Sequence, residues 1–416
     1  HTVSTSVWRR NPGRTHSLTT NWTSLLASEL SMRYGCNPHQ TGARCFHPTG
    51  ELPLQALHNS PSYINLMDAL NSWQLVRELK AATGLPAAAS FKHVSPAGAA
   101  VGVPLTQQLR AALFIKPDAE LSPLACAYAR ARGADRLASF GDWIAVSDPL
   151  DRATAELIRV EMSDGIIAPG FEEGTVEILS RKKGGDYKVL QIDPTYEPDV
   201  TESRQLFGLN LEQHRNNFIP GDDYLQNVVT TNKDLTEAAR RDLLVATIAV
   251  KYTQSNSVVA TLEGQIVGAG AGQQSRIHCV RLACGKADRW YLRQHPEVLG
   301  LRFRKGVTRA DRDNAIDLFF EDELSIAEEN AWQSTFRQVP ERLSKSDRQQ
   351  WLDVMKGVAI SSDAFFPFRD NIDRASRSGV GYVVQPGGSI KDDVVITAAD
   401  EYGMFMALSG VRLFHH

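Results

Sequence analysis

Residues 85–100, LPAAASFKHVSPAGAA, join a short apolar run to a lysine–histidine pair and then to a Ser-Pro-Ala-Gly sequence. The apolar run predicts a short buried strand, and residues 95–98 predict the turn that follows it. Ahead of the strand, apolar residues recur at helical spacing over residues 64–81, and Gly84 is the stop signal of that helix. A helix, a buried strand and a polar turn in this order are typical of an α/β unit.

The second half of the chain shows a similar order of elements. Residues 235–253 predict a helix, and residues 255–272, SNSVVATLEGQIVGAGAG, predict two strands joined at Glu263-Gly264 before another helix from about Gln274. Alternating α and β segments favour three-layer α/β domains with central sheets. We therefore expect two related domains, at residues 32–198 and 199–416, and a helical insert within the second at about residues 304–357. Residues 1–31 are expected to be a leader or interdomain linker.

Other segments have recognisable patterns as well. Residues 122–148 predict a helix and then a strand. Residues 175–193 predict a hairpin turned at Gly184-Gly185. Residues 379–388 and 393–399 predict short strands.

The composition limits the classes of function. The 416 residues carry a formal net charge of −3, with 42% hydrophobic and 22% charged residues, which is ordinary for a soluble globular protein. We therefore expect neither nucleic acid nor a membrane as a partner, and functional basic side chains should face a small anion. Five scattered cysteines without a CxxC pair favour reduced thiols, a cytoplasmic location and no structural zinc site.

Five stretches place polar residues where the pattern predicts the ends of elements. They are residues 32–40, 90–100, 250–258, 268–279 and 361–371. For each, the simpler interpretation is a turn with capping residues. On that interpretation Lys92 is a solvated strand end, and His93 is a partly buried imidazole with its hydrogen bonds satisfied.

Two of these stretches fit ligands more specifically. Arg276 follows a glycine-rich turn that lacks dinucleotide or P-loop spacing, and it could bind an anion at a helix N-terminus. Three phenylalanines between Phe365 and Phe368 crowd around Pro367 beside charged residues, which suits a pocket for a flat aromatic ligand better than a plain core. Residues 295–297, HPE, match half of the zinc deaminase signature, but no Pro-Cys-x-x-Cys occurs in the sequence.

Taken together, the stretches resemble the formyltransferase half of one family, the bifunctional aminoimidazole carboxamide ribonucleotide (AICAR) transformylase/IMP cyclohydrolase. The resemblance covers about residues 32–416 and is carried, in the family's order, by RYG-NPHQ, SFKHVSPAGAA, ARARGADR–SFGD, SDGIIAPGFEE, KYTQSNSV, GAGQQSRIHC, SSDAFFPFRDN and RLFHH. It implies two cytidine-deaminase-like α/β/α domains with a small helical piece and no zinc, in a homodimer with active sites at the subunit interface. The family's cyclohydrolase domain lies N-terminal to this region, so we do not expect ring closure from these residues.

The resemblance implies transfer of a formyl group from 10-formyltetrahydrofolate to the 5-amino group of AICAR. That amine is a weak nucleophile, so the reaction needs a base for its proton and donors for the developing oxyanion. His93 is the expected base, kept neutral by the charge of Lys92, which could also protonate the folate leaving nitrogen. Asn256 would orient the carboxamide or formyl group. The alternative is a catalytically silent nucleotide- or folate-binding module, which would need no base.

The resemblance also implies three sets of contacts. The phosphate of the nucleotide would be held by Arg33 and Arg412. The full set of nucleotide contacts would be Arg33, Tyr34, Gly141, Asp164, Arg276, Phe365 and Arg412. The folate would contact Leu137, Ile277, Asn314, Pro367, Phe368, Asp370 and Ser389. Leu137 stands where the family has methionine. A structural potassium ion would be held by Val250, Thr253, Ser255, Ser257, Asp363 and Leu413.

Overall fold

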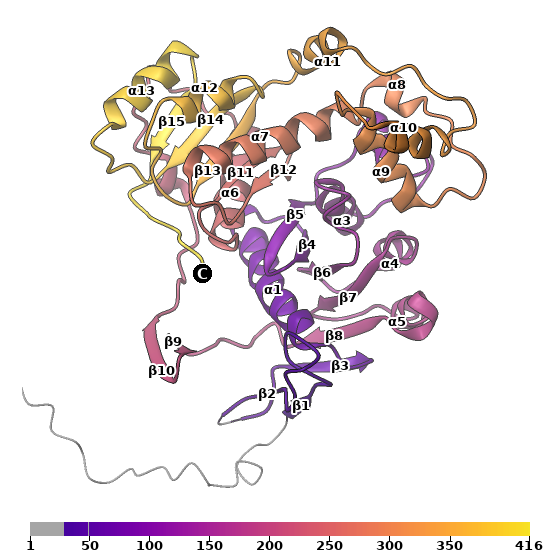
Figure 1. Ribbon diagram of the computed structural model, residues 1–416. Coiled ribbons are helices and arrows are strands. Elements are labelled where there is room, and N and C mark those ends of the chain that lie inside the picture. The colour runs from indigo at the N-terminus through magenta and orange to yellow at the C-terminus, as the bar shows by residue number, and fades with distance from the viewer. Residues whose placement is uncertain (1–28, 49) are drawn as a thin grey trace, which may run out of the picture.

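The computed structural model describes residues 29–48 and 50–416, and its centre is one mixed sheet of eleven strands (Figure 1). The strands follow the order β15-β14-β13-β11-β12-β5-β4-β6-β7-β8-β3 across the sheet. Their bounds are β3 Leu54–His58, β4 Ala87–Lys92, β5 Ser95–Val101, β6 Asp142–Val146, β7 Ser163–Ala168, β8 Lys188–Ile192, β11 Val258–Leu262, β12 Gln265–Gly270, β13 Val358–Ser362, β14 Val380–Gln385 and β15 Phe405–Leu408. The predicted α/β class is confirmed.

The sheet contains the same five-strand arrangement twice. In the first repeat, β4 pairs antiparallel with β5 and β6, and β7 and β8 continue from β6 in parallel. In the second, β11 pairs antiparallel with β12 and β13, and β14 and β15 continue in parallel. The two repeats join where Gln265 of β12 pairs antiparallel with Ala100 of β5. The topology therefore shows two similar units within one sheet, while the predicted domain boundaries stay a prediction.

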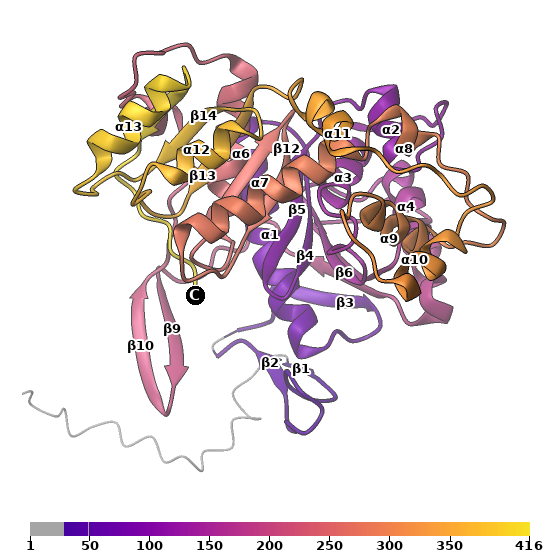
Figure 2. The ribbon, with the colours of Figure 1, turned by 45° about the horizontal axis from the view of Figure 1, so that its top comes forward.

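Helices cover both faces of this sheet (Figures 1 and 2). On one face, α1 (Tyr63–Thr83) and α6 (Glu237–Lys251) share an apolar cluster that spans both repeats. The other face packs against α3 Pro123–Gly133, α4 Arg152–Arg159, α5 Thr175–Ser180, α7 Arg276–Leu292, α12 Asp370–Ser376 and α13 Asp392–Glu401. Beside this face lie α2 Gln107–Ala112 and the helical insert α8 Pro296–Leu299, α9 Arg309–Phe319, α10 Ile326–Gln333 and α11 Lys345–Leu352.

Helix α1 shows how the sequence sets an element. Ser62 Oγ accepts from the backbone N–H of Asn65, and Asn65 Oδ1 accepts from the backbone N–H of Ser62, which closes a capping box at the first turn. Gly84 ends the helix with φ 71°, a backbone conformation that costs glycine little. The predicted helix and its stop signal are therefore confirmed.

Two small antiparallel pairs lie outside the main sheet. The first is β1 (Glu29–Ser31) with β2 (Arg44–Phe46), next to the end of α1. The second is β9 (Thr201–Leu206) with β10 (Leu209–His214), which projects from the body as an arm (Figures 1 and 2). The arm lies within residues 194–234, which the sequence predicts as a connection.

Three predicted local structures are wrong. Residues 175–193 form α5, a 3-10 turn at Lys182–Gly185 and β8, and residues 393–399 lie inside α13. Both errors have one cause: β7 with β8 and β14 with β15 are parallel pairs, and parallel strands need a crossover helix where antiparallel strands need only a hairpin. Residues 95–98 belong to β5, because the chain has already turned at residues 93 and 94. The predicted leader or linker over residues 1–31 lies almost wholly outside the described residues.

Candidate functional site

One end of the sheet collects most of the predicted site residues. In the first repeat, the end of β4 lies across from the starts of β5 and β6. In the second, the start of β11 lies across from the ends of β12 and β13. Because β5 and β12 are antiparallel, both groups of ends face the same way. We call this end the site edge; it comprises residues 92–95, 141–143, 163–164, 254–258, 270–276, 362–370, 386–391 and 408–413.

A direct contact joins the two repeats at the site edge. Ser95 Oγ, at the start of β5, accepts from the backbone N–H of Gln254 at 3.2 Å. Gln254 lies two residues before Asn256. The segments that carry two predicted catalytic residues, His93 and Asn256, are thus in contact within one chain. The sequence did not predict this contact, because it joins residues 159 positions apart.

His93 lies exposed at the tip of the β4–β5 hairpin. His93 and Val94 form its two-residue loop with φ of 52° and 62°, the positive values of a type I′ turn. Val94 is β-branched, and this backbone region costs an L-residue about 1–2 kcal/mol. Lys92 Nζ donates to the backbone oxygen of Phe140 at 2.5 Å, next to Gly141. An ammonium carries three donors, so Lys92 has further N–H groups for a ligand.

The second repeat provides an internal comparison for this tip. Asp242 of α6 accepts from the backbone N–H groups of Glu263 and Gly264, at 2.8 and 2.6 Å, in the two-residue loop between β11 and β12. That loop also has positive φ, and it has glycine at the second position, where the conformation costs little. The first hairpin has His93 and Val94 at the same two positions. Both loops have a non-glycine residue with positive φ at the first position, but only the first hairpin has one at the second position as well, and such strain clusters at functional sites.

We expect Val94→Gly to raise the free energy of unfolding by about 0.5–1 kcal/mol, because it relieves the left-handed strain at the cost of some chain entropy. The control is Val200→Gly, at an exposed valine without positive φ, which should lower stability by a similar amount. Urea denaturation of both variants measures the difference. Equal losses of stability in the two variants would show that the loop is not strained.

The buried carboxylate of Asp68 holds the loop formed by His93 and Val94. It lies on α1, is 6% exposed, and its Oδ1 accepts from the backbone N–H of Val94 at 2.7 Å. Burial raises the pKa of Asp68 to about 6, against the lowering effects of the Val94 hydrogen bond and the nearby His93. In the sequence, this residue is only an aspartate among the apolar positions of a predicted helix. Asp68 is therefore a supporting residue that the sequence motifs did not reveal.

The raised pKa of Asp68 predicts a pH dependence of stability. Between about pH 4 and pH 6 the folded chain keeps a proton that the unfolded chain has lost, so the free energy of unfolding falls as pH rises through this window. The contribution is on the order of 2–3 kcal/mol. Asp68→Asn should remove this slope, whereas Asp118→Asn, at an exposed loop position, should keep it. Chemical denaturation at pH 4, 5, 6 and 7 tests this, and an unchanged slope in Asp68→Asn would contradict it.

A buried ion pair positions Asn256. Arg276 Nη2 donates to Asn256 Oδ1 at 3.1 Å, while Asn256 Nδ2 donates to the backbone oxygen of Gln274 at 3.2 Å. Arg276 Nη1 also donates to Asp363 and to the backbone oxygen of Ser257, and the arginine is 7% exposed. Arg276 therefore orients Asn256 in this chain, and its direct contact with a nucleotide stays a prediction. The amide of Asn256 keeps one donor and one lone pair for a ligand.

The residues predicted for a potassium ion lie in the last turn of α6, just after it, or around Asp363. They are Val250, Thr253, Ser255, Ser257, Asp363 and Leu413. Ser255 Oγ and the backbone N–H of Ser257 donate to Asp363 Oδ2 at 2.6 and 3.1 Å. The backbone N–H of Leu413 donates to the backbone oxygen of Asp363 at 2.9 Å. The buried hydroxyl of Ser257 has no hydrogen-bond partner. Such an oxygen suits a hard cation, so the residues present fit the predicted ion.

The aromatic stretch after β13 divides between core and surface. Phe366 is fully buried in the apolar cluster under α7, so it does not line a ligand pocket as the sequence predicted. Phe365 and Phe368 are exposed, and Lys391 Nζ lies 5.6 Å from the centre of the Phe368 ring. Four predicted folate residues lie on the site edge, and they are Pro367, Phe368, Asp370 and Ser389. Ile277, in the first turn of α7, directly follows the edge segment 270–276.

Some predicted contacts lie elsewhere in the chain. Arg33 and Tyr34 follow β1, and Figures 1 and 2 place the β1–β2 pair away from the chain end that follows Arg412. Asp164, by contrast, lies on the site edge at the start of β7, where it binds Lys183 at 2.7 Å and is close enough to Asp68 to influence its pKa. A single chain thus leaves the two arginines predicted for the phosphate on separate segments.

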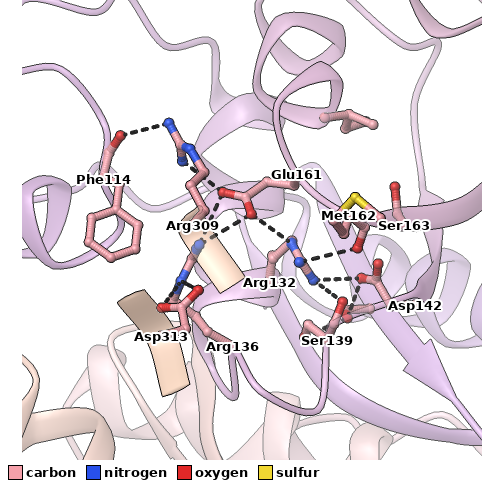
Figure 3. A network of polar contacts seen from close by, with 12 residues as sticks. Phe114, Arg132, Arg136, Ser139, Asp142, Glu161, Met162, Ser163, Arg309 and Asp313 are labelled. Carbon is pink, nitrogen blue, oxygen red and sulfur yellow. Dashed lines mark hydrogen bonds and ion pairs between the residues drawn. The ribbon is translucent and has the colours of Figure 1, made fainter. Parts of the chain in front are cut away.

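A buried charge network joins the first repeat to the helical insert (Figure 3). Arg136 Nε donates to Asp313 at 2.9 and 3.0 Å, and Arg136 Nη2 donates to Glu161 at 3.1 and 3.2 Å. Arg309 adds a bond to Glu161 at 2.9 Å, and Arg132 lies 3.4 Å from it. Burial alone would raise the pKa of Asp313, but the charges of the arginines around it hold that pKa below its usual value.

This network fixes the two remaining predicted folate contacts. Leu137 directly follows Arg136, and Asn314 directly follows Asp313 on α9; both are exposed. The buried ion pair of Arg136 with Asp313 therefore holds the two segments together, while the side chains of Leu137 and Asn314 lie at the surface. The ion pair of Arg136 with Asp313 could not be predicted from the sequence, because the two residues lie 177 positions apart.

The described residues contain neither a cluster of acidic, histidine or cysteine metal ligands nor a membrane-spanning helix. No group of three or more His, Cys, Asp or Glu side chains in residues 29–48 and 50–416 could hold a metal ion. No helix in this part of the chain is long and apolar enough to cross a membrane.

Comparison with known proteins places the chain in a family. A family described as "AICARFT/IMPCHase bienzyme" matches residues 4–286. The bifunctional purine biosynthesis protein PurH of Xylella fastidiosa is 31% identical over 391 residues, which cover 92% of this chain and 58% of that protein. The PurH proteins of Cereibacter sphaeroides and Roseobacter denitrificans are also 31% identical, over 93% of this chain. The chain spans about three-fifths of the length of these relatives, and it belongs to the AICARFT/IMPCHase bienzyme family of purine biosynthesis.

Proposed function

We propose that this chain transfers a formyl group from 10-formyltetrahydrofolate to the 5-amino group of AICAR, giving FAICAR and tetrahydrofolate on the route to IMP. The observation that carries the proposal is the exposed His93 on a strained tip, where the equivalent loop of the second repeat has Glu263-Gly264. IMP cyclohydrolase activity would belong to the protein only if the full-length polypeptide contains the N-terminal domain of the family.

In the proposed reaction the imidazole of His93 accepts the proton of the AICAR amine as that amine attacks the formyl carbon. A general base at this position increases the rate of the reaction by about 10²–10⁴-fold. Asn256, held by Arg276, offers an N–H group to the formyl oxygen or a lone pair to the carboxamide. Lys92 lies next to His93 with N–H donors beyond its bond to Phe140, and it protonates the leaving nitrogen of the folate. The exposed rings of Phe365 and Phe368 offer apolar surface to the flat ligands.

The proposal includes a homodimer with the active site at the subunit interface. Two observations support it: the segments of Arg33 and Arg412 lie apart within one chain, and the arm β9–β10 is exposed along its whole length (Figure 1). Phe207, Leu209 and Leu211 on this arm are exposed apolar residues, and a two-stranded ribbon alone is marginally stable in water. A second copy would cover the arm and bring further segments to the site edge.

Three finer expectations belong to the same proposal. The two repeats are each of the cytidine-deaminase-like α/β/α type without zinc, a structural potassium ion sits beside Asp363, and the protein acts in the cytoplasm. The unpartnered hydroxyl of Ser257 supports the ion. If bound, the ion would stiffen the segment that leads to Asn256.

A silent nucleotide- or folate-binding module is the competing proposal, and a direct assay separates the two. The purified chain is mixed with AICAR and 10-formyltetrahydrofolate, and the release of tetrahydrofolate and FAICAR is followed. We expect turnover. Saturable AICAR binding without any product would favour the silent module.

A further inference from the structure

A cavity of about 190 Å³ lies between the first repeat and the helical insert. It is bounded by the segment that follows α2, the end of α7, the loop after α8, and α9. Its lining combines apolar side chains, Phe114, Val298, Leu301, Phe303 and Ile316 among them, with the polar groups of Arg293 and Arg312. None of the residues predicted for the nucleotide, the folate or the cation lines it.

The two arginines of this cavity differ in their partners. Arg293 Nη2 donates to Asp313 at 2.5 Å, and Asp313 also compensates the buried Arg136. Arg312 has no carboxylate partner among the described residues, and its Nε is buried without a hydrogen-bond partner. Its guanidinium lies 5.5 Å from the centre of the Phe303 ring. Arg312 is therefore a cation in the cavity lining that no described carboxylate neutralises, and it lies beside an aromatic ring.

We propose that this cavity binds a small monocarboxylate with an apolar body. The carboxylate would accept from the guanidinium of Arg312, whose planar donors match two carboxylate oxygens. The body would pack against Phe303, Phe114 and Ile316. An apolar cavity of roughly 150 Å³ holds benzene, so this one has room for a ring with one carboxylate. Nucleotides and other drug-sized ligands need about 300 Å³ or more, which excludes them here.

Benzoate is the probe that tests the proposal on the full chain at constant ionic strength. Isothermal titration or ligand-detected NMR is expected to show saturable binding of benzoate with 1:1 stoichiometry. Benzyl alcohol, which has the same ring without the charge, should bind at least tenfold more weakly. Inorganic phosphate, which has the charge without the ring, should also bind at least tenfold more weakly. These three ligands are compared on the unaltered chain, so a folding defect of a variant cannot affect the result.

Arg312→Gln should weaken benzoate binding at least tenfold and should fold, because it breaks no ion pair. The matched control Arg302→Gln, at an exposed arginine of the same insert outside the cavity, should bind benzoate like the original chain. Ile316→Phe, which fills the cavity without touching a charge, should block binding. The proposal is overturned by no saturable binding up to 50 mM benzoate, by equal binding in Arg312→Gln, or by phosphate binding as tightly as benzoate.

Discussion

His93→Ala is expected to lower kcat for formyl transfer by about 10²–10⁴-fold, which is the range for loss of a general base. The affinity for AICAR should stay within tenfold, or about 1.4 kcal/mol, because the phosphate and base contacts are predicted elsewhere. The imidazole lies exposed at the hairpin tip, so its removal leaves no cavity and the fold should be unchanged. Steady-state kinetics at saturating folate and calorimetric titration with AICAR measure the two quantities.

The repeat supplies a matched control for this variant. Glu263 occupies the same position as His93 in the equivalent loop, at the opposite end of the sheet. Glu263→Ala removes a tip side chain of the same kind of hairpin and should leave kcat unchanged. An unchanged kcat in His93→Ala would refute the assigned role. A loss of AICAR affinity greater than the loss of kcat would make His93 a binding residue instead.

Asp313→Ala is expected to have the largest effect on stability, about 3–5 kcal/mol, because it leaves buried arginines without their shared carboxylate. Arg136 and Arg293 both bond to Asp313, and all three side chains are largely buried. Figure 3 shows Arg136 beside Asp313. The low pKa of Asp313 in the folded chain means that this stabilisation is present at neutral pH and is lost as pH falls through that pKa. Urea denaturation at pH 7 gives the value.

The control for Asp313 lies on the same helix. Asp317 pairs with Arg289 at 2.8 Å, but both side chains are about one-third exposed. Asp317→Ala removes the same charge from α9 and should cost about 0.2–1 kcal/mol, as exposed ion pairs do. Equal losses in the two variants would show that burial of the network contributes nothing. Because Asp313 adjoins Asn314, the variant should also raise KM for the folate more than it lowers kcat.

The local parts of this fold are predictable from sequence. Gly84 ends α1 where expected, and Glu263-Gly264 turns the second hairpin where expected. Two of the three failures share a physical reason: whether a short apolar run forms a strand or a helix depends on its neighbours in space. Residues 393–399 read as a strand, yet they lie in α13 because β14 and β15 are parallel and need a crossover.

The candidate site was predictable to a similar extent. The motif residues around His93 and Asn256 do meet at one end of the sheet, as Ser95 and Gln254 show. The supporting residues were not found, because Asp68 looks like one polar position in a helix. Its role appears only when α1 packs under the hairpin and Asp68 accepts from Val94.

Chemical rescue tests the role of His93 as the base most directly. The rate of formyl transfer by His93→Ala is measured at saturating AICAR and 10-formyltetrahydrofolate with increasing imidazole at fixed pH and ionic strength. A base missing from an exposed hairpin tip should be replaced from solution, so kcat is predicted to rise with imidazole concentration while Glu263→Ala shows no response. A flat response in His93→Ala with AICAR binding intact, or original turnover without imidazole, would contradict the assignment.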